Sequence, residues 1–157
     1  MKNLLLFLLL SLFVFTSCDK DDDSGMPFPT KDLITMAQEG GYTSLATALI
    51  KADLINDLKG IGPFTVFAPT NQAFDNLLST IGQSSIDDVP VNVLKRILLY
   101  HVIDSKVAST GISAGNVPTL EGSNVVITTS GGIMVNNAMV INPYDVEATN
   151  GIIHTID

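Results

Sequence analysis

The spacing of apolar residues changes halfway along this chain, and that change limits the folds open to it. Between residues 33 and 101 apolar residues recur at intervals of three and four, the period of a helix that buries one face. From residue 124 onward, short runs of β-branched and apolar residues are separated by turn residues, which is typical of strands. Because the helices come first and the strands follow, the sequence predicts an α+β fold.

Four helices and one strand are predicted in the first half. Their apolar positions place the helices over 33–37, 45–52, 74–81 and 94–101, with a short helical turn over 54–58. Thr43 or Ser44 can cap the second helix, Thr70 the third, and the segment Asp87-Asp88-x-Pro90 opens the fourth.

The strands are predicted from composition and from the turns between them. Residues 64–68 are rich in β-branched and aromatic side chains, and Pro69 ends that strand. The second half predicts strands over 124–129, 133–135, 139–141, 146–148 and 152–156. Asn136-Asn137 predicts a tight turn, and Pro143-Tyr144 is expected to break the run of strand residues.

The N-terminus predicts a targeting segment. Lys2 precedes an apolar run over residues 4–15, which is interrupted only by Ser11. A membrane-spanning helix needs ~20 apolar residues, so this run is too short to be one. The pattern is that of a secretory signal peptide, and we assign it to residues 1–17.

Cys18 lies three residues after the end of the apolar run and is the only cysteine in the chain. The sequence Phe15-Thr16-Ser17-Cys18 resembles the bacterial lipobox, in which the cysteine is acylated and becomes the new N-terminus. Cys18 is therefore the predicted lipidation site, carrying palmitate-type acyl chains that hold the protein on a membrane, because several acyl chains together anchor firmly.

Residues 18–29 predict a solvated tether rich in Asp and Pro. A Cys followed by Lys and several Asp resembles the surface-export signal of Bacteroidetes-type lipoproteins. The predicted location is the outer membrane, with the domain exposed at the cell surface; a periplasm-facing orientation is the alternative. The folded domain is predicted over 30–157.

Composition narrows the classes of partner. The chain carries 8 Lys and Arg against 16 Asp and Glu, a formal charge of −8. Nucleic-acid binding needs clustered basic residues, so no nucleic-acid partner is expected. A lone cysteine excludes an internal disulfide framework. The 46% hydrophobic content is raised by the apolar N-terminal segment.

Three segments resemble the signatures of the fasciclin (FAS1) domain, in the same order and with similar spacing. They are residues 64–74 (FTVFAPTNQAF), 98–103 (LLYHVI) and 150–157 (NGIIHTID). The resemblance implies a twisted β-sandwich or wedge of about six to seven strands, flanked by several helices that lie mostly in the N-terminal half. It also implies an extracellular, adhesive module without a catalytic site.

The final signature differs from the family pattern in one respect. In the family it continues for a few apolar residues and usually a Pro, whereas this chain stops at Asp157. Two explanations are open: the chain is truncated, or its last strand is short.

Most signature residues are expected to determine the fold. Thr70 can cap a helix, Phe67 and Phe74 can bury area on either side of the turn, and Gly151 tolerates a positive φ after Asn150. The full set of predicted structural residues is Phe67, Pro69, Thr70, Asn71, Phe74, Asn150, Gly151 and His154.

Tyr100 and His101 are the candidate binding residues. The resemblance implies an adhesive Tyr-His surface that contacts a partner. The alternative for His101 is a satisfied core histidine, because it falls on the apolar face of the predicted helix.

No catalytic, metal or cofactor site is expected. The sequence has no Gly-x-Ser-x-Gly elbow, no phosphate-binding Gly-x-x-x-x-Gly-Lys loop and no His-Glu-x-x-His motif. The leading hypothesis is a lipid-anchored adhesion module that binds an extracellular protein or polysaccharide. The alternative is a small-ligand-binding or envelope-structural lipoprotein with a cleft between helices and sheet. The oligomeric state is left open.

Overall fold

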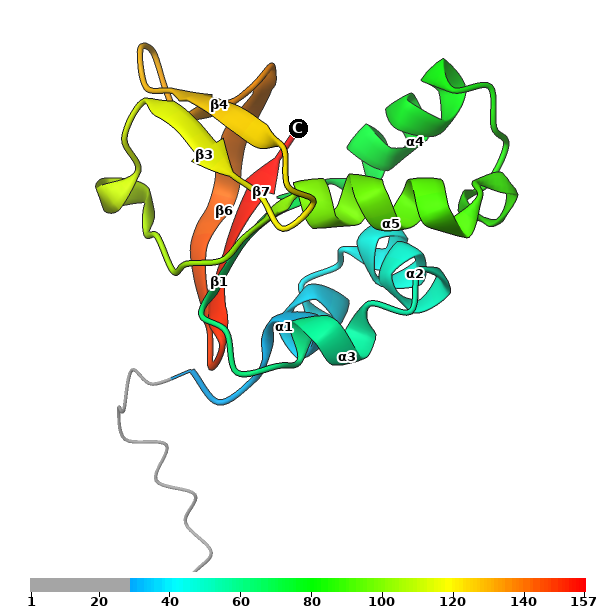
Figure 1. The fold of residues 1–157 in the computed structure, drawn as a ribbon, viewed down its shortest axis with the longest axis horizontal. Helices are drawn as coiled ribbons and strands as arrows, with labels where there is room; N and C mark the ends of the chain where they lie inside the picture. Colours follow the sequence, from blue (N-terminus) through cyan, green and yellow to red (C-terminus); the bar gives the residue numbers. More distant parts are fainter. Residues whose placement is uncertain (1–28) are drawn as a thin grey trace, which may run out of the picture.

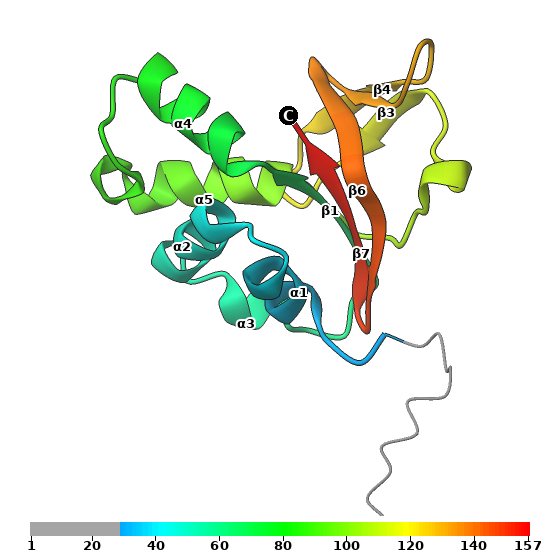
Figure 2. The ribbon, with the colours of Figure 1, turned by 180° about the vertical axis from the view of Figure 1, so that it is seen from behind.

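The computed structural model describes residues 29–157, so the predicted signal peptide, Cys18 and nearly all of the tether lie outside the described residues. The helices gather on one side of the molecule and the strands on the other (Figure 1, Figure 2). The helices are α1 (Leu33–Glu39), α2 (Thr43–Lys51), α3 (Ile55–Leu58), α4 (Asn71–Thr80) and α5 (Val91–Tyr100). The strands are β1 (Phe64–Pro69), β2 (Val102–Ile103), β3 (Gly115–Pro118), β4 (Asn124–Thr128), β5 (Met134–Val135), β6 (Ala138–Ala148) and β7 (Gly151–Ile156).

The seven strands form one sheet in the order β2-β1-β7-β6-β5-β4-β3. The three signature segments supply β1, β2 and β7, which are neighbours in this sheet. β1 pairs with β7 in parallel, with Phe64 opposite Gly151 and Pro69 opposite Ile156, whereas the other pairs are antiparallel. The first and last strands of the domain therefore lie side by side.

Two hydrophobic cores are built on opposite faces of this sheet. The larger one joins the helices to the sheet and includes Leu49, Leu98 and Ile153. The smaller one includes Phe67, Ile127 and Ile156. Since β1 and β4 are far apart in the strand order but share the smaller core, the sheet folds over so that its two ends face each other.

The α+β prediction is confirmed, with seven strands and with the helices in the N-terminal half. Thr70 caps α4, accepting a hydrogen bond from the backbone amide of Ala73 at 3.1 Å. An additional cap that the sequence analysis did not identify is Asp32, which accepts from the Thr35 amide at the start of α1.

The prediction that Pro143-Tyr144 interrupts the strands was wrong. β6 runs from Ala138 to Ala148 without a break. Its pairing with β7 shifts register between Ile141 and Val146. Pro143 lies within this irregular stretch, where its missing backbone N–H does not interrupt the hydrogen bonds between the two strands.

The starts of two helices also differ from prediction. Neither Thr43 nor Ser44 caps α2 with its side chain; the residue at that position is Tyr42, which makes no capping bond. Residues Ile86–Asp88 form a separate 3₁₀ turn before α5, and Pro90 stands at the N-cap of the helix. β2 and β3 were not predicted. β2 is only two residues long, and β3 has a single β-branched residue, Val117, among Gly, Asn and Pro.

Candidate functional site

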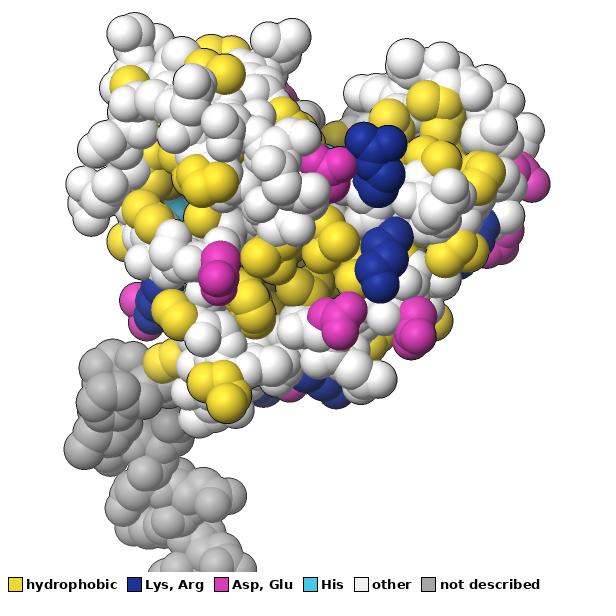
Figure 3. Space-filling model, in the orientation of Figure 1, with side chains coloured by type: hydrophobic (Ala, Val, Ile, Leu, Met, Phe, Trp, Pro, Cys, Tyr) yellow, Lys and Arg dark blue, Asp and Glu magenta, His cyan; other side chains and the backbone are white. Residues whose placement is uncertain are grey.

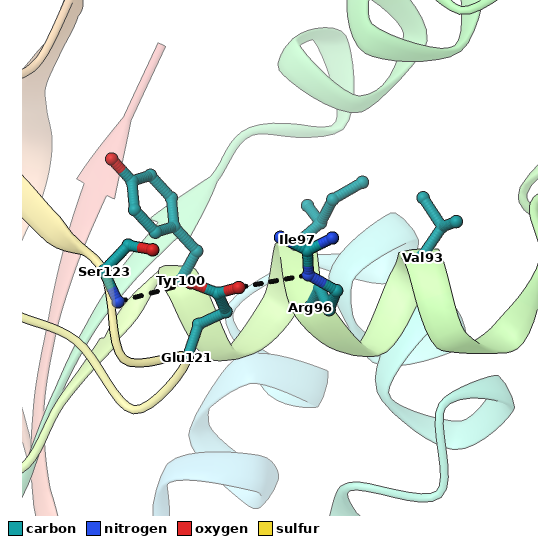
Figure 4. Close-up of a pocket in the computed structure, with 6 residues that line it drawn as sticks. All are labelled: Val93, Arg96, Ile97, Tyr100, Glu121 and Ser123. Atoms are coloured by element: carbon teal, nitrogen blue, oxygen red, sulfur yellow. Dashed lines mark hydrogen bonds and ion pairs between the residues drawn. The ribbon is translucent and has the colours of Figure 1, made fainter.

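Helix α5 carries the candidate binding residue Tyr100 on a face that leaves the core. Leu94 and Leu98 are buried beneath the helix. Val93, Ile97 and Tyr100 follow at positions i, i+4 and i+7 and therefore share one face, turned by roughly 100° around the helix from the two buried leucines. Val93 is 41% exposed, and Ile97 and Tyr100 are half-buried. This face turns toward the loop that joins β3 to β4 (Figure 4).

The Tyr100 hydroxyl fixes the orientation of the ring. It donates to the backbone carbonyl of Asn124 at 3.1 Å and accepts from the Asn136 side-chain amide at 3.0 Å. Asn136 adopts a positive φ of 54° in the turn between β5 and β6, and its own Oδ1 accepts from the Val126 amide at 2.9 Å. Tyr100 thus joins α5 to two segments of the sheet.

A surface hollow of about 350 Å³ lies along this face of α5. Its lining, drawn in Figure 4, consists of Val93, Arg96, Ile97, Tyr100, Glu121 and Ser123. Hydrophobic side chains gather between the sheet and the helices on the face shown in Figure 3, with basic side chains beside them. The site is apolar with a charged rim.

The rim is an ion pair between Arg96 and Glu121. Arg96 Nε lies 3.1 Å from Glu121 Oε1, and the Ser123 amide donates to the other carboxylate oxygen at 3.3 Å. The hydrogen bonds from Ser123 and Arg96 lower the pKa of Glu121 below its ordinary value. Glu121 therefore stays ionised and holds the guanidinium at the edge of the hollow.

His101 lies at the C-cap of α5 rather than within the core. Its Nδ1 is 2.6 Å from the Ile97 carbonyl, to which it donates. Burial lowers the pKa of His101 although this hydrogen bond favours the charged form. Its ring packs edge-to-face on Tyr100, with centroids 6.3 Å apart. The half-buried imidazole is neutral at pH 7 and ends the helix.

The family model for the fasciclin domain matches residues 40–157, three quarters of the chain. This chain belongs to the fasciclin family.

Relatives of this fasciclin domain come from bacteria, animals and plants. It is 42% identical over 117 residues to the uncharacterized protein sll1735 of Synechocystis, covering 74% of this chain and 86% of that relative. It is 34% identical over 121 residues to human periostin, covering 76% of this chain and 14% of periostin. It is 39% identical over 107 residues to the cell surface glycolipoprotein MPB83 of Mycobacterium bovis, covering 67% and 46%.

Among solved structures, the fasciclin domain matches a FAS1 domain pair from the insect cell adhesion molecule fasciclin I. The TM-score is 0.58 at 23% identity, covering 77% of this chain and 45% of that one. At this identity the match establishes the fold. The FAS1 fold that the sequence resemblance implied is thereby confirmed.

Two predicted structural residues of the fasciclin domain make hydrogen bonds across the helical layer. Asn71 accepts from the Ser44 amide and donates to the Gly41 carbonyl, each at 3.0 Å, and so caps α2 from outside. Asn150 accepts from the Leu33 amide at 3.0 Å and donates to the carbonyls of Leu58 and Gly60. Phe67 and Phe74 are buried in the smaller and larger core respectively.

Gly151 is needed for a different reason from the one predicted. It is not among the glycines with a positive φ. Instead, a Cβ at this position would lie 2.3 Å from the Phe64 carbonyl oxygen on β1. The absence of a side chain lets β7 and β1 approach each other.

His154 lies in a polar cluster that the sequence analysis did not identify. It is fully buried, with Nε2 2.8 Å from the Val107 carbonyl and Nδ1 accepting from the Asp145 amide at 3.3 Å. Asp145 in turn accepts from the Ser109 amide at 2.6 Å and from its hydroxyl. The Ser109 hydroxyl contacts the carboxylate rather than the imidazole, so the cluster lacks the arrangement of a serine nucleophile with a histidine base.

Among the described residues, no three His, Cys, Asp or Glu side chains come together in a way that could hold a metal ion. Within residues 29–157 no helix is long and apolar enough to cross a membrane.

Tyr100 and His101 were proposed as binding residues from the sequence, whereas Arg96, Glu121 and Asn136 were missed. Of these three residues, only Asn136 gave a signal in the sequence, as part of a predicted turn. The contacts themselves join residues 25 and 36 positions apart, and such contacts leave no local pattern.

Proposed function

We propose that this fasciclin domain is displayed outside the cytoplasm on a lipid anchor at Cys18, and that it mediates adhesion by binding a protein or polysaccharide through the α5 face. The observation that carries the proposal is the exposed hollow on α5. It combines apolar side chains, an aromatic ring held by two hydrogen bonds, and a charged rim. A rigid aromatic group beside apolar contacts is the usual centre of a protein interface.

The relatives support an external location. MPB83, at 39% identity, is a cell surface glycolipoprotein, and the structural match comes from a cell adhesion molecule. The lipobox-like residues before Cys18 and the acidic tether after it agree with a lipoprotein. We propose the outer membrane as the site of anchoring, with the domain at the cell surface.

A small ligand in the cleft between helices and sheet is the weaker alternative. The α5 hollow lies on the surface, and its volume of about 350 Å³ is near the lower end of the ~300–1,000 Å³ that small-molecule pockets occupy. A surface hollow with a charged rim suits the side chain of a larger partner better.

Binding is tested with residues 18–157 bearing Cys18→Ala, immobilised and exposed to surface proteins and polysaccharides of the producing cells. The same experiment is run with Tyr100→Ala, which removes the ring and both hydroxyl hydrogen bonds. We expect binding to fall at least ~10-fold while the variant still unfolds cooperatively above 37 °C. Equal binding by a folded Tyr100→Ala variant would reject the α5 face as the binding surface.

The anchor is tested separately by fractionating cells that make the full chain with Cys18→Ala. We expect the unchanged chain to incorporate labelled palmitate and to be recovered with the outer membrane. The variant should incorporate none and be lost from that fraction. Unchanged labelling of the variant would exclude Cys18 as the acylated residue.

A further inference from the structure

A second hollow, of about 220 Å³, lies inside the folded sheet and away from the α5 face. It is bounded by β1, β2, β3 and β4 and by the segment 105–113, which we call the strap. Six of its lining residues are apolar: Phe67, Ile103, Val107, Ile112, Val117 and Ile127. None of these lines the α5 hollow.

The walls of this hollow offer a ligand almost nothing but hydrocarbon. Phe67, Ile103 and Ile127 are each no more than 5% exposed. The Thr65 hydroxyl in the wall is already occupied, because it donates to the Ser105 carbonyl and accepts from the Val107 amide at 2.9 Å. In residues 29–157 no buried side-chain nitrogen or oxygen lacks a hydrogen-bond partner. Inside the hollow, a polar ligand would therefore lose its hydration without meeting an unpaired buried side chain; Ser113, the other hydroxyl of the lining, lies at the exposed end.

The size of the hollow sets the size of its occupant. An apolar cavity of ~150 Å³ stays dry and binds benzene. At about 220 Å³ this hollow has room for a group larger than one benzene ring. We propose that it is a binding site for a small uncharged hydrocarbon group, larger than benzene and without a charged end inside the hollow.

The strap closes one wall and is tied down mainly at its N-terminal end. The Val107 carbonyl accepts from His154 Nε2 at 2.8 Å, and the Ser109 amide donates to Asp145 at 2.6 Å. Gly111 and Ser113, at the other end, are exposed. A hydrocarbon group therefore enters beside Gly111–Ser113, where no hydrogen bond of the strap to the sheet has to break.

This proposal does not depend on the adhesion proposal. The hollow shares no lining residue with the α5 face, so substitutions on one surface leave the other intact. A protein that fails to adhere can still bind a hydrocarbon, and the reverse also holds.

The test is a titration of residues 18–157 bearing Cys18→Ala with n-butylbenzene, followed through the isoleucine methyl resonances. We expect saturable shifts at Ile103, Ile112 and Ile127 and none at Ile50, which is 62% exposed on α2. The same concentration of 4-butylbenzoate, which carries a charge on a similar skeleton, should shift them at least ~10-fold less. Absence of saturable shifts with butylbenzene would overturn the proposal.

A matched pair of variants tests the location. Val117→Trp places an indole in the hollow. Val126→Trp places one on the face of β4 that points away from Ile127 and the hollow, where the Val126 side chain is 47% exposed. We expect butylbenzene affinity to fall at least ~10-fold in Val117→Trp and to stay within twofold in Val126→Trp. Since the chain has no other Trp, bluer emission from Val117→Trp checks that the indole is buried.

Equal affinity in both Trp variants would overturn the proposal. If Val117→Trp does not fold, Val107→Phe fills the same hollow from the strap, and retained affinity in that variant overturns the proposal equally.

Discussion

At the scale of single residues, Asn150 links parts of the domain that are far apart in sequence. Its side-chain oxygen accepts from the first amide of α1, and its nitrogen donates to two carbonyls at the end of α3. All three backbone groups would otherwise lack a partner at a helix end, where such groups have no intrahelical bond. Asn150 is only 8% exposed, so water cannot readily replace it.

Replacing Asn150 by Ala should lower the free energy of unfolding by about 2–4 kcal/mol, because it leaves buried backbone groups unsatisfied. Urea denaturation of the two proteins measures the difference. Asn92→Ala, on the exposed side of α5, serves as the control and should change stability by less than about 0.5 kcal/mol. A loss in Asn150→Ala no larger than in the control would contradict this role.

Asp145 makes the stability of the domain depend on pH. Burial by itself raises the pKa of this carboxyl, but the two hydrogen bonds that Ser109 donates to it outweigh burial and lower the pKa below its ordinary value of 3.8. A carboxyl whose pKa is lowered by folding stabilises the fold above its unfolded pKa. That contribution disappears as the pH falls through the lowered, folded-state pKa.

Asp145→Asn should therefore be less stable than the unchanged protein at pH 7, and the difference should shrink below pH ~4. Asn also suits the positive φ of 56° at this position, so the backbone is not perturbed. Thermal unfolding from pH 7 to pH 3 gives the comparison. A difference that stays constant over this range would show that the charge of Asp145 does not contribute.

At the scale of elements, the parallel pair β1 and β7 joins the first strand of the domain to the last. Gly151 opens β7 directly opposite Phe64, where an added Cβ would meet the Phe64 carbonyl at 2.3 Å. Asn150 directly precedes β7, and its side chain bonds to the start of α1 and the end of α3. The final signature therefore stabilises both the sheet and the helices.

Gly151→Ala should destabilise the domain by about 1–3 kcal/mol, because β1 and β7 must move apart. Gly111→Ala is the matched control: its added Cβ would lie no closer than 3.7 Å to Val107, and Gly111 has no positive φ. Chemical denaturation should separate the two variants clearly. If both lose the same stability, close approach is not the reason for Gly151.

The elements that could be predicted from the sequence are those whose own residues determine them. The spacing of Leu94 and Leu98 predicted α5, and Thr70 predicted the start of α4. β6 was predicted as two pieces because Pro143 normally ends a strand; the register shift that accommodates it depends on pairing with β7. β3 pairs only with the next strand, β4, and its own residues Gly115, Asn116 and Pro118 are not typical of a strand, so its sequence carried no signal.

At the scale of the whole molecule, the domain consists of a structural frame and two hollows that differ in chemistry. Three signature segments form the adjacent strands β2, β1 and β7 at one end of the sheet. The α5 hollow has a charged rim, whereas the hollow inside the sheet is closed by the strap and lined by hydrocarbon. The Tyr100 position was foreseen from the signature, but its partners on β4 and the β5–β6 turn emerged only from tertiary structure.

Two substitutions on α5 distinguish adhesion through the α5 face from adhesion through another surface. Val93→Asp and Val91→Asp each add a carboxylate to an exposed position in the first turn of α5, where negative charge is tolerated. Only Val93 lines the hollow beside Tyr100.

The decisive measurement is the retention, under flow, of beads coated with each variant on a layer of producing cells. We expect Val93→Asp to lower the retained fraction at least ~10-fold and Val91→Asp to match the unchanged domain, with both variants equally stable. Equal retention of the two variants would contradict adhesion through this face.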